Sequence, residues 1–304
     1  MARQFIPQNK GPAVIKSVNS NNISDAYRDS ITISYQYFNA VVPDTAFDWY
    51  GKTVDTPIMA GPIGNRNADP DWQVAYARAV AEAGSIYWVD FHSPDQWKKI
   101  LDAGLPAIRV IKPLADMDQI LECIKYDTEH GALGYAMDVD HGMTVYGQID
   151  GQQQPFAPKT AKDLEIISQA SPLPFYAKGI LSVADALIAK DAGVSGIIVS
   201  GHNNRFPCAV PPLKILPKIR EAVGDDFGIL IDGGFHTGYD AFKALALGAD
   251  GVLCARDLMA SFVKDGAEGL TTKITEINAE LMGAMANTGS PDLAHINKNA
   301  LILL

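Results

Sequence analysis

The chain has 304 residues, 47% of them hydrophobic, which is enough to bury a core of α/β-barrel size. A formal net charge of -10 argues against nucleic acid or an anionic membrane as the main partner. Three scattered cysteines give no disulfide framework or zinc pattern. The stretch "MARQFIPQNKGP" lacks the apolar run of a signal peptide and no segment is long enough to span a bilayer, so we expect a cytoplasmic protein.

In chain order, residues 1–50 form an N-terminal extension that is expected to pack over one end of the fold. Eight short apolar runs follow it, and each is bounded by turn-forming or polar residues. Continuous apolar runs are typical of parallel strands that are buried on both faces. The predicted strands are 56–62, 84–90, 107–113, 134–140, 174–180, 196–202, 228–234 and 251–257.

Helical patterns lie between most of these strands. The segment "DPDWQVAYARAVAEAG" begins with Asp69 as a possible N-cap and Pro70 at the first helical position, and it closes on Gly84. Alternating strands and helices predict an α/β fold, a (β/α)8 TIM barrel, as a single domain over 1–304. A last helix is expected at about 266–288, with the C-terminal residues lying on the surface.

Polar groups follow the predicted strands, and in TIM barrels this end carries the functional residues. The stretch "GIIVSGHNNRFP" puts His202 and Arg205 there, just after the sixth strand. The other groups expected at this mouth are Ala60, Gly61, Pro62, Asp90, His92, Lys112, Asp138, Asp140, His141, Lys178, Asp232, Gly233, Gly234, Ala255 and Arg256.

The glycines and the arginine after the last two strands favour a phosphate site. Gly233 and Gly234 let backbone N–H groups approach an anion closely, and Arg256 could bind the same anion through paired hydrogen bonds. The alternative is a plain tight turn beside a surface ion pair.

Three charged groups after the fourth and fifth strands leave several functions open. Lys178 could bind a ligand's negative charge, act as a Schiff-base nucleophile, or form a structural ion pair. Asp138 and Asp140 alternate on a predicted strand, so they are expected to point the same way, toward loop N–H groups or a ligand. A metal site with His141 is conceivable, but no ligand set has clear metal-site spacing.

Two segments, "YAKGILSVADALIAKDAGVSGIIVSGHNNRF" and "ILIDGGFHTGYDAFKALALGADGVLCAR", resemble the FMN-dependent α-hydroxyacid oxidase and dehydrogenase family, which includes glycolate oxidase and lactate oxidase. The match is continuous from about Tyr176 to the helix beyond Arg256. It is weaker from Thr56 to Asp140 and poor in residues 1–50. The resemblance implies FMN as cofactor, a small anionic 2-hydroxy acid as substrate, and a homotetramer.

The resemblance also implies a role for each matching residue. Lys178 matches the lysine at the flavin's pyrimidine edge, His202 the base that removes a hydroxyl or α-proton, Arg205 the substrate-carboxylate anchor, and Asp138 the family's strand-4 aspartate. A paired aspartate would orient the base. The matching cofactor-binding residues are Ala60, Gly61, Lys178, Asp232, Gly233, Gly234, Ala255 and Arg256.

The chain departs from the family pattern at the base-bearing loop and at the phosphate site. Asn203 and Asn204 replace two glycines between the base and the arginine, Cys208 replaces an aspartate, His236 replaces a phosphate-binding arginine, and Ala255 replaces a glycine. Asn tolerates left-handed backbone, so the turn is expected to persist.

The substrate side departs further. The stretch "IRVI" at 108–111 lacks the family's tyrosine, the second carboxylate-binding arginine has no counterpart, and the family's lid insertion is shortened. Lys112, His141, Asn203 and Asn204 are the candidates to replace the missing groups. Two rival functions stay open: an FMN enzyme without net redox, like type 2 isopentenyl diphosphate isomerase, or a flavin-free barrel, either a Lys178 lyase or a binding protein.

Overall fold

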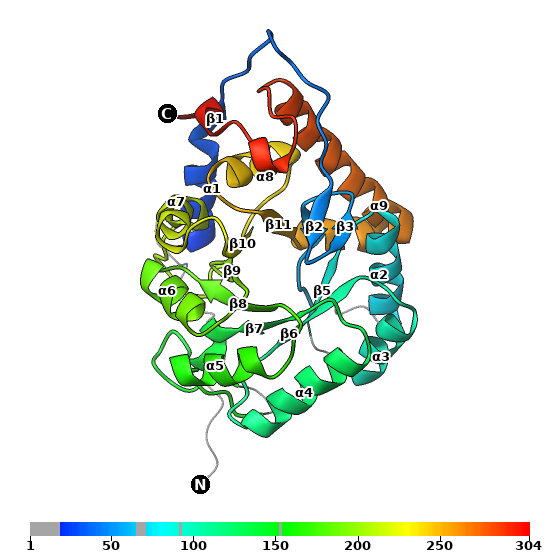
Figure 1. Ribbon diagram of the computed structural model, residues 1–304, viewed down its shortest axis with the longest axis vertical. Coiled ribbons are helices and arrows are strands. Elements are labelled where there is room, and N and C mark those ends of the chain that lie inside the picture. Colours follow the sequence, from blue (N-terminus) through cyan, green and yellow to red (C-terminus); the bar gives the residue numbers. More distant parts are fainter. Residues whose placement is uncertain (1–18, 65–70, 91–92, 152–153) are drawn as a thin grey trace.

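The computed structural model describes residues 19–64, 71–90, 93–151 and 154–304. Eight parallel strands close into a barrel that is surrounded by helices (Figure 1), which confirms the predicted (β/α)8 architecture. The barrel strands are β4 (Ile58–Ala60), β5 (Tyr87–Asp90), β6 (Ala107–Ile111), β7 (Tyr135–Asp138), β8 (Phe175–Ile180), β9 (Gly196–Val199), β10 (Gly228–Asp232) and β11 (Gly251–Cys254).

Each predicted strand overlaps one observed strand, but several end earlier than expected. β9 ends at Val199 and β11 at Cys254, whereas the predicted strands ran to 202 and 257. β7 ends at Asp138, so Asp140 lies beyond it, in the short 3₁₀ helix η2 (Val139–Gly142). The expectation that Asp138 and Asp140 alternate on one strand was therefore wrong, because the chain turns into a helical conformation after Asp138.

The helices that cover the barrel are α2 (Trp72–Glu82), α3 (Pro94–Asp102), α4 (Met117–Glu129), α5 (Ala161–Gln169), α6 (Val183–Asp191), α7 (Pro212–Val223), α8 (Gly238–Ala246) and α9 (Arg256–Ala286). The proposed cap Asp69 and Pro70 lie outside the described residues. α9 is two helices joined at Gly266, whose φ of 67° breaks the helical backbone, and the second of them corresponds to the predicted 266–288 helix.

The barrel interior is filled with side chains and is closed at its N-terminal end. Trp88, Leu230 and Leu253 are among its buried residues. A hairpin of β2 (Phe47–Trp49) and β3 (Lys52–Val54) covers this end, and Trp49, only 2% exposed, joins the interior cluster. Its indole Nε1 donates to the carbonyl of Leu133 at 3.0 Å. The functional groups therefore gather at the opposite end.

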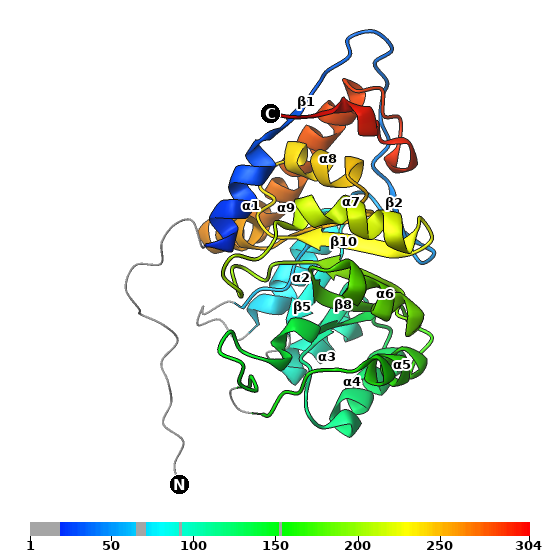
Figure 2. The same cartoon turned by 90° about the vertical axis from the view of Figure 1, so that its left-hand side faces the viewer.

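The described part of the N-terminal extension reaches both ends of the barrel. Helix α1 (Ser20–Asp29) and the β2–β3 hairpin lie on opposite sides of the molecule (Figure 2). Between them, β1 (Ile31–Ile33) pairs antiparallel with β12 (Leu301–Leu303), which ties the C-terminal residues to the surface. Among the described residues, no helix has the length and apolar character needed to cross a membrane.

Candidate active site

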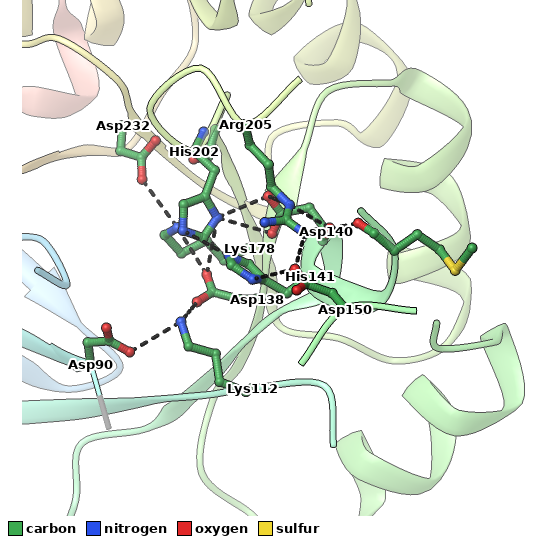
Figure 3. Close-up of polar contacts among 12 residues, drawn as sticks. Asp90, Lys112, Asp138, Asp140, His141, Asp150, Lys178, His202, Arg205 and Asp232 are labelled. Carbon is green, nitrogen blue, oxygen red and sulfur yellow. Dashed lines mark hydrogen bonds and ion pairs between the residues drawn. The ribbon is translucent and has the colours of Figure 1, made fainter. Parts of the chain in front are cut away.

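A network of charged side chains lies at the C-terminal end of the barrel (Figure 3), with Asp138 at its centre. One Asp138 oxygen, Oδ1, accepts from Lys178 Nζ on β8 at 3.0 Å. The other, Oδ2, accepts from Lys112 Nζ, just after β6, at 2.6 Å. Lys178 Nζ also lies 3.6 Å from Asp232 Oδ2, and Lys112 Nζ lies 3.2 Å from Asp90 Oδ1. Five charged groups at this end of the barrel are therefore linked.

Burial and ion pairing together fix the charges in this network. Burial opposes the charged form of Asp138, but Lys178 and Lys112 outweigh it and hold the pKa of the carboxyl well below its usual range. Burial likewise opposes a charged Lys178, yet Asp138 and Asp232 raise the pKa of its ammonium. Because a Schiff-base nucleophile must be a neutral amine, this environment does not favour the lyase alternative.

His202 is held by a carboxylate on a neighbouring loop. Its Nδ1 lies 2.9 Å from Asp140 Oδ2 and 3.8 Å from Asp138 Oδ1. Gly179 of β8 makes this approach possible, because a Cβ at that position would collide with the Asp140 carboxyl. With Nδ1–H donated to Asp140, the lone pair of His202 lies on Nε2, as a general base requires.

His141, also on η2, contacts the other nitrogen of this imidazole. Its Nε2 lies 3.3 Å from His202 Nε2. Burial, together with the neighbouring His202 and Lys112, lowers the pKa of His141 to about 4. His141 is therefore neutral at neutral pH, and the two Nε2 atoms share a single hydrogen bond.

Arg205 is enclosed by η2 and the segment that follows it. Its Nε donates to the carbonyl of Asp140 at 2.9 Å, and its Nη2 donates to the carbonyl of Met143 at 2.9 Å. Nη2 also contacts Asp150 Oδ2 at 2.5 Å. Sequence reasoning missed Asp150, because nothing local in "YGQIDG" signals a partner that lies 55 positions further along the chain.

A cleft of about 250 Å³ opens beside this network, and its lining includes Lys178, His202 and Arg256. Gly233 and Gly234 line it too, with φ of 108° and 92°, a conformation that L side chains rarely adopt. The predicted groups Gly61, Asp232 and Ala255 line the same cleft, whereas Ala60 is fully buried at the end of β4.

This cleft fits a phosphate-bearing cofactor. Among the described residues, no side chain caps the N-terminus of α9 at Ala255, so its first N–H groups are available to an anion. Arg256 is exposed and forms no ion pair or hydrogen bond within the part of the chain that the structure describes. His236 Nδ1 lies 2.7 Å from Asp257 Oδ2, so this replacement for the family's arginine is paired with a carboxylate.

The loop between His202 and Arg205 keeps a left-handed backbone without its glycines. His202, Asn203 and Asn204 have φ of 45°, 53° and 61°. Both new side chains bind α1: Asn204 Oδ1 accepts from the Ser20 amide at 2.7 Å, and Asn203, which also lines the cleft, accepts through Oδ1 from Asn21 Nδ2 at 2.9 Å. Helix α1 therefore supports the base-bearing loop.

Two other expectations concern residues near this site. Asp138, His141 and His202 place potential metal-ligand atoms within 4.8 Å of one another, but both Asp138 oxygens already pair with lysines, which a cation would have to displace. His92, also expected at the mouth, lies outside the described residues.

Sequence reasoning also missed Arg28 of α1. Its guanidinium donates to the carbonyl of Gly234 and contacts Asp240 at 3.4 Å, so α1 also supports the glycine turn of the cleft. A contact across 206 positions, between a helix and a turn, leaves no local pattern in the sequence.

Curated relatives share most of their length with this chain. A 4-hydroxymandelate oxidase of Amycolatopsis orientalis is 29% identical over 281 residues, covering 81% of this chain and 79% of the relative. An L-lactate oxidase of Alicycliphilus denitrificans is 30% identical over 300 residues, with 83% and 79% covered. Glycolate oxidase 3 of Arabidopsis thaliana is 28% identical over 287 residues, with 82% and 78% covered.

Solved structures agree with the sequence relatives. A mandelate oxidase variant carrying a monooxide FMN adduct superposes with a TM-score of 0.83 at 27% identity, covering 94% of this chain and 91% of that one. Mandelate oxidase with (S)-2-phenylpropionate gives a TM-score of 0.83 at 26% identity, with 94% and 89% covered.

The model of the FMN-dependent dehydrogenase family matches residues 16–155 and 148–303, nearly the whole chain. Together with the barrel and the phosphate-compatible cleft at its C-terminal end, this match shows that the chain belongs to the FMN-dependent dehydrogenase family and is an FMN-dependent oxidoreductase.

Proposed function

We propose that this enzyme oxidises a small 2-hydroxy acid or a related alcohol, with His202 as the catalytic base. The observation that carries the proposal is the His202–Asp140 pair, whose imidazole lines the same cleft as Lys178 and the glycine turn at Gly233. A base next to a phosphate-compatible cleft suits alcohol oxidation, in which a proton and a hydride equivalent leave the substrate together.

The glycine turn, the N-terminus of α9 and Arg256 would hold the FMN phosphate. Lys178 would lie at the ring, where its ammonium stabilises negative charge. When bound, FMN accepts the two electrons of the substrate's α C–H bond. The remaining cofactor-binding assignments are Ala60, Gly61, Asp232 and Ala255, and the cleft lining of Gly61, Asp232 and Ala255 supports three of them.

His202 Nε2 would take the hydroxyl proton. The resulting imidazolium is stabilised by Asp140 through Nδ1–H, while Asp138 keeps Lys178 and Lys112 in place. Arg205, three positions after the base, would anchor the oxygen-bearing end of the substrate.

Replacing the base provides the test. The holoenzyme, mixed anaerobically with glycolate, lactate and mandelate, should lose its visible flavin absorbance with at least one of them. In His202→Asn the rate of this reduction should fall by about 10²–10⁴-fold while FMN stays bound, since only the proton acceptor is removed. An unchanged rate would exclude His202 as the base.

We also propose a cytoplasmic homo-oligomer, a tetramer by family resemblance, built from one domain over residues 1–304. Its cysteines are unpaired, which suits a reducing compartment. Tyr37, Phe38 and Val42 expose 82%, 89% and 94% of their surface on one segment, which suits burial against another subunit. Light scattering on the purified protein measures the assembly.

A further inference from the structure

Asp150, in the segment after η2, accepts a hydrogen bond from the Arg205 guanidinium, the group expected to bind the substrate carboxylate (Figure 3). We propose that Asp150 is a specificity-determining residue, which closes the Arg205 anion site from within and makes the enzyme prefer uncharged 2-hydroxy carbonyl compounds, such as amides, to free 2-hydroxy acids. This inference rests on the proposed function and names the substrate class of the same site.

The Arg205 guanidinium has no edge on which two N–H groups are both free to bind a substrate carboxylate. A bidentate pair needs two parallel N–H groups on one edge of the fork. On the edge formed by Nε and Nη2, Nε donates to the carbonyl of Asp140, and Nη2 donates to the carbonyl of Met143 and to Asp150. With Nη2 fully used, a substrate carboxylate reaches both nitrogens of an edge only by displacing one of these acceptors.

Asp150 is a strong competitor for Arg205. The side chains of Arg205 and Asp150 are only 15% and 21% exposed, so the pair is shielded from water. Burial opposes the charged form of Asp150, but the hydrogen bond from Arg205 outweighs it and lowers the pKa of the carboxyl. A tethered carboxylate acts at an effective concentration of about millimolar or above, which a free acid must exceed.

The surroundings of Asp150 hold it against the arginine. The Asp150 amide donates to the carbonyl of Gly142 at 3.3 Å, and its own carbonyl accepts from the Phe156 amide at 3.2 Å. Its Oδ2 also lies 3.4 Å from His141 Nδ1. Displacing the carboxylate would leave it partly buried without its cation, which costs free energy.

The charge of the whole network also disfavours an added anion. Carboxylates outnumber cations: Asp90, Asp138, Asp140, Asp150 and Asp232 surround Lys112, Lys178 and Arg205. His141 is neutral at neutral pH and adds no positive charge. An uncharged carbonyl group needs only one donor and brings no further negative charge, so it fits this site better than a carboxylate.

The test compares glycolate with glycolamide, which differ in charge and little in size. In the wild-type holoenzyme kcat/KM should be higher for glycolamide. In Asp150→Asn the glycolate-to-glycolamide ratio of kcat/KM should rise by at least about tenfold, because the competing charge is gone. Asp102→Asn, an equal change of charge on the outer helix α3, should leave the ratio unchanged. A ratio within about twofold of wild type in Asp150→Asn overturns the proposal.

A double-mutant cycle locates the effect. If Asp150 acts through Arg205, the change in ratio caused by Asp150→Asn should vanish in an Arg205→Met background. A change that persists there would mean that Asp150 repels acids without closing the arginine site, which contradicts the proposal.

Calorimetric binding separates this inference from the proposed function. If the wild-type holoenzyme oxidises neither glycolate nor glycolamide, the proposed function fails for these two compounds. The Kd values of both compounds for wild type and Asp150→Asn then test the role of Asp150 by themselves. Glycolate should bind Asp150→Asn at least about tenfold more tightly than wild type while glycolamide binds equally. Equal glycolate affinity in both proteins would overturn the role of Asp150.

Discussion

Arg256 and Lys178 are both cations of the cleft, but they differ in what surrounds their charge. Lys178 is buried between Asp138 and Asp232, whereas Arg256 is exposed and has no ion-pair partner among the residues described. A cation that is not paired with a carboxylate is available to bind an anionic ligand. Arg256 is therefore expected to bind the phosphate more strongly than Lys178 does.

Removing Arg256 should weaken cofactor binding. Arg256→Ala should raise the Kd for FMN about tenfold to a hundredfold, because a charge-assisted hydrogen bond contributes about 1.5–3 kcal/mol. Quenching of FMN fluorescence by the apoprotein measures it. Lys264→Ala removes an exposed cation from the same helix that does not line the cleft, and it should have no effect. Equal losses in both variants would mean that only general charge matters.

His141 gives the site a pH dependence. Its pKa is about 4 in the folded protein and about 6.5 when unfolded, so the unfolded chain binds more protons between these values. The contribution of His141 to stability is therefore complete above pH 6.5 and is lost as the pH falls toward 4.

Replacing this histidine should reduce that loss. His141→Gln should lose less stability between pH 7 and pH 4.5 than wild type, because glutamine takes up no proton. Urea midpoints at the two pH values measure the difference. A variant that loses as much stability as wild type would show that His141 is readily protonated in the folded state.

At the scale of elements, a buried ion pair joins β6 to α4 on the outside of the barrel. Arg109 Nη2 lies 2.6 Å from Asp127 Oδ1, which also accepts from Trp97 Nε1 at 2.8 Å. Asp127 is fully buried, and burial raises the pKa of its carboxyl to about 6 despite the arginine. The pair is therefore costly to bury, and costlier to break.

Breaking this pair should destabilise the barrel. Asp127→Ala should lower the free energy of unfolding by about 3–5 kcal/mol, because it leaves a buried guanidinium without its carboxylate. The double variant Arg109→Met with Asp127→Leu should recover most of the loss. Urea unfolding checks both, and a single variant as stable as wild type would contradict the buried-pair account.

Local patterns in the sequence predicted the barrel elements well. Apolar runs such as "GIIVSGH" are long enough to indicate buried strands, and all eight were found. The β2–β3 hairpin was missed because its two strands have three residues each, too short for any alternation to show. Its turn has Tyr50 and Gly51 at φ of 46° and 87°, and the sequence "WYGK" does not predict a left-handed backbone at a tyrosine.

The site was predicted less completely than the fold, for a physical reason. Lys178, His202 and Arg256 follow strands, so barrel geometry alone brings them to one mouth. The contacts of Arg205 with Asp150, and of α1 with Asn203 and Asn204, join segments that are distant in sequence. Such contacts depend on loop conformation, which no periodic pattern encodes.

At the scale of the whole molecule, the two ends of the barrel are built differently. The N-terminal end is closed by Trp49 and its hairpin over an apolar interior, and the C-terminal end carries the charged network and the cleft. Helix α1 adds support from outside the barrel to both the base-bearing loop and the glycine turn. Within the part of the chain that the structure describes, the groups that could bind a substrate and its cofactor therefore lie at the C-terminal end of the barrel.

The most direct test of the account is an anaerobic titration of the purified holoenzyme with 2-hydroxy acids and their amides, followed by its visible absorbance. The account predicts a flavin spectrum that bleaches with at least one of these compounds, as electrons pass from the substrate to FMN beside His202. A protein that is colourless and takes up no added FMN, or a flavin that none of them bleaches, would contradict it.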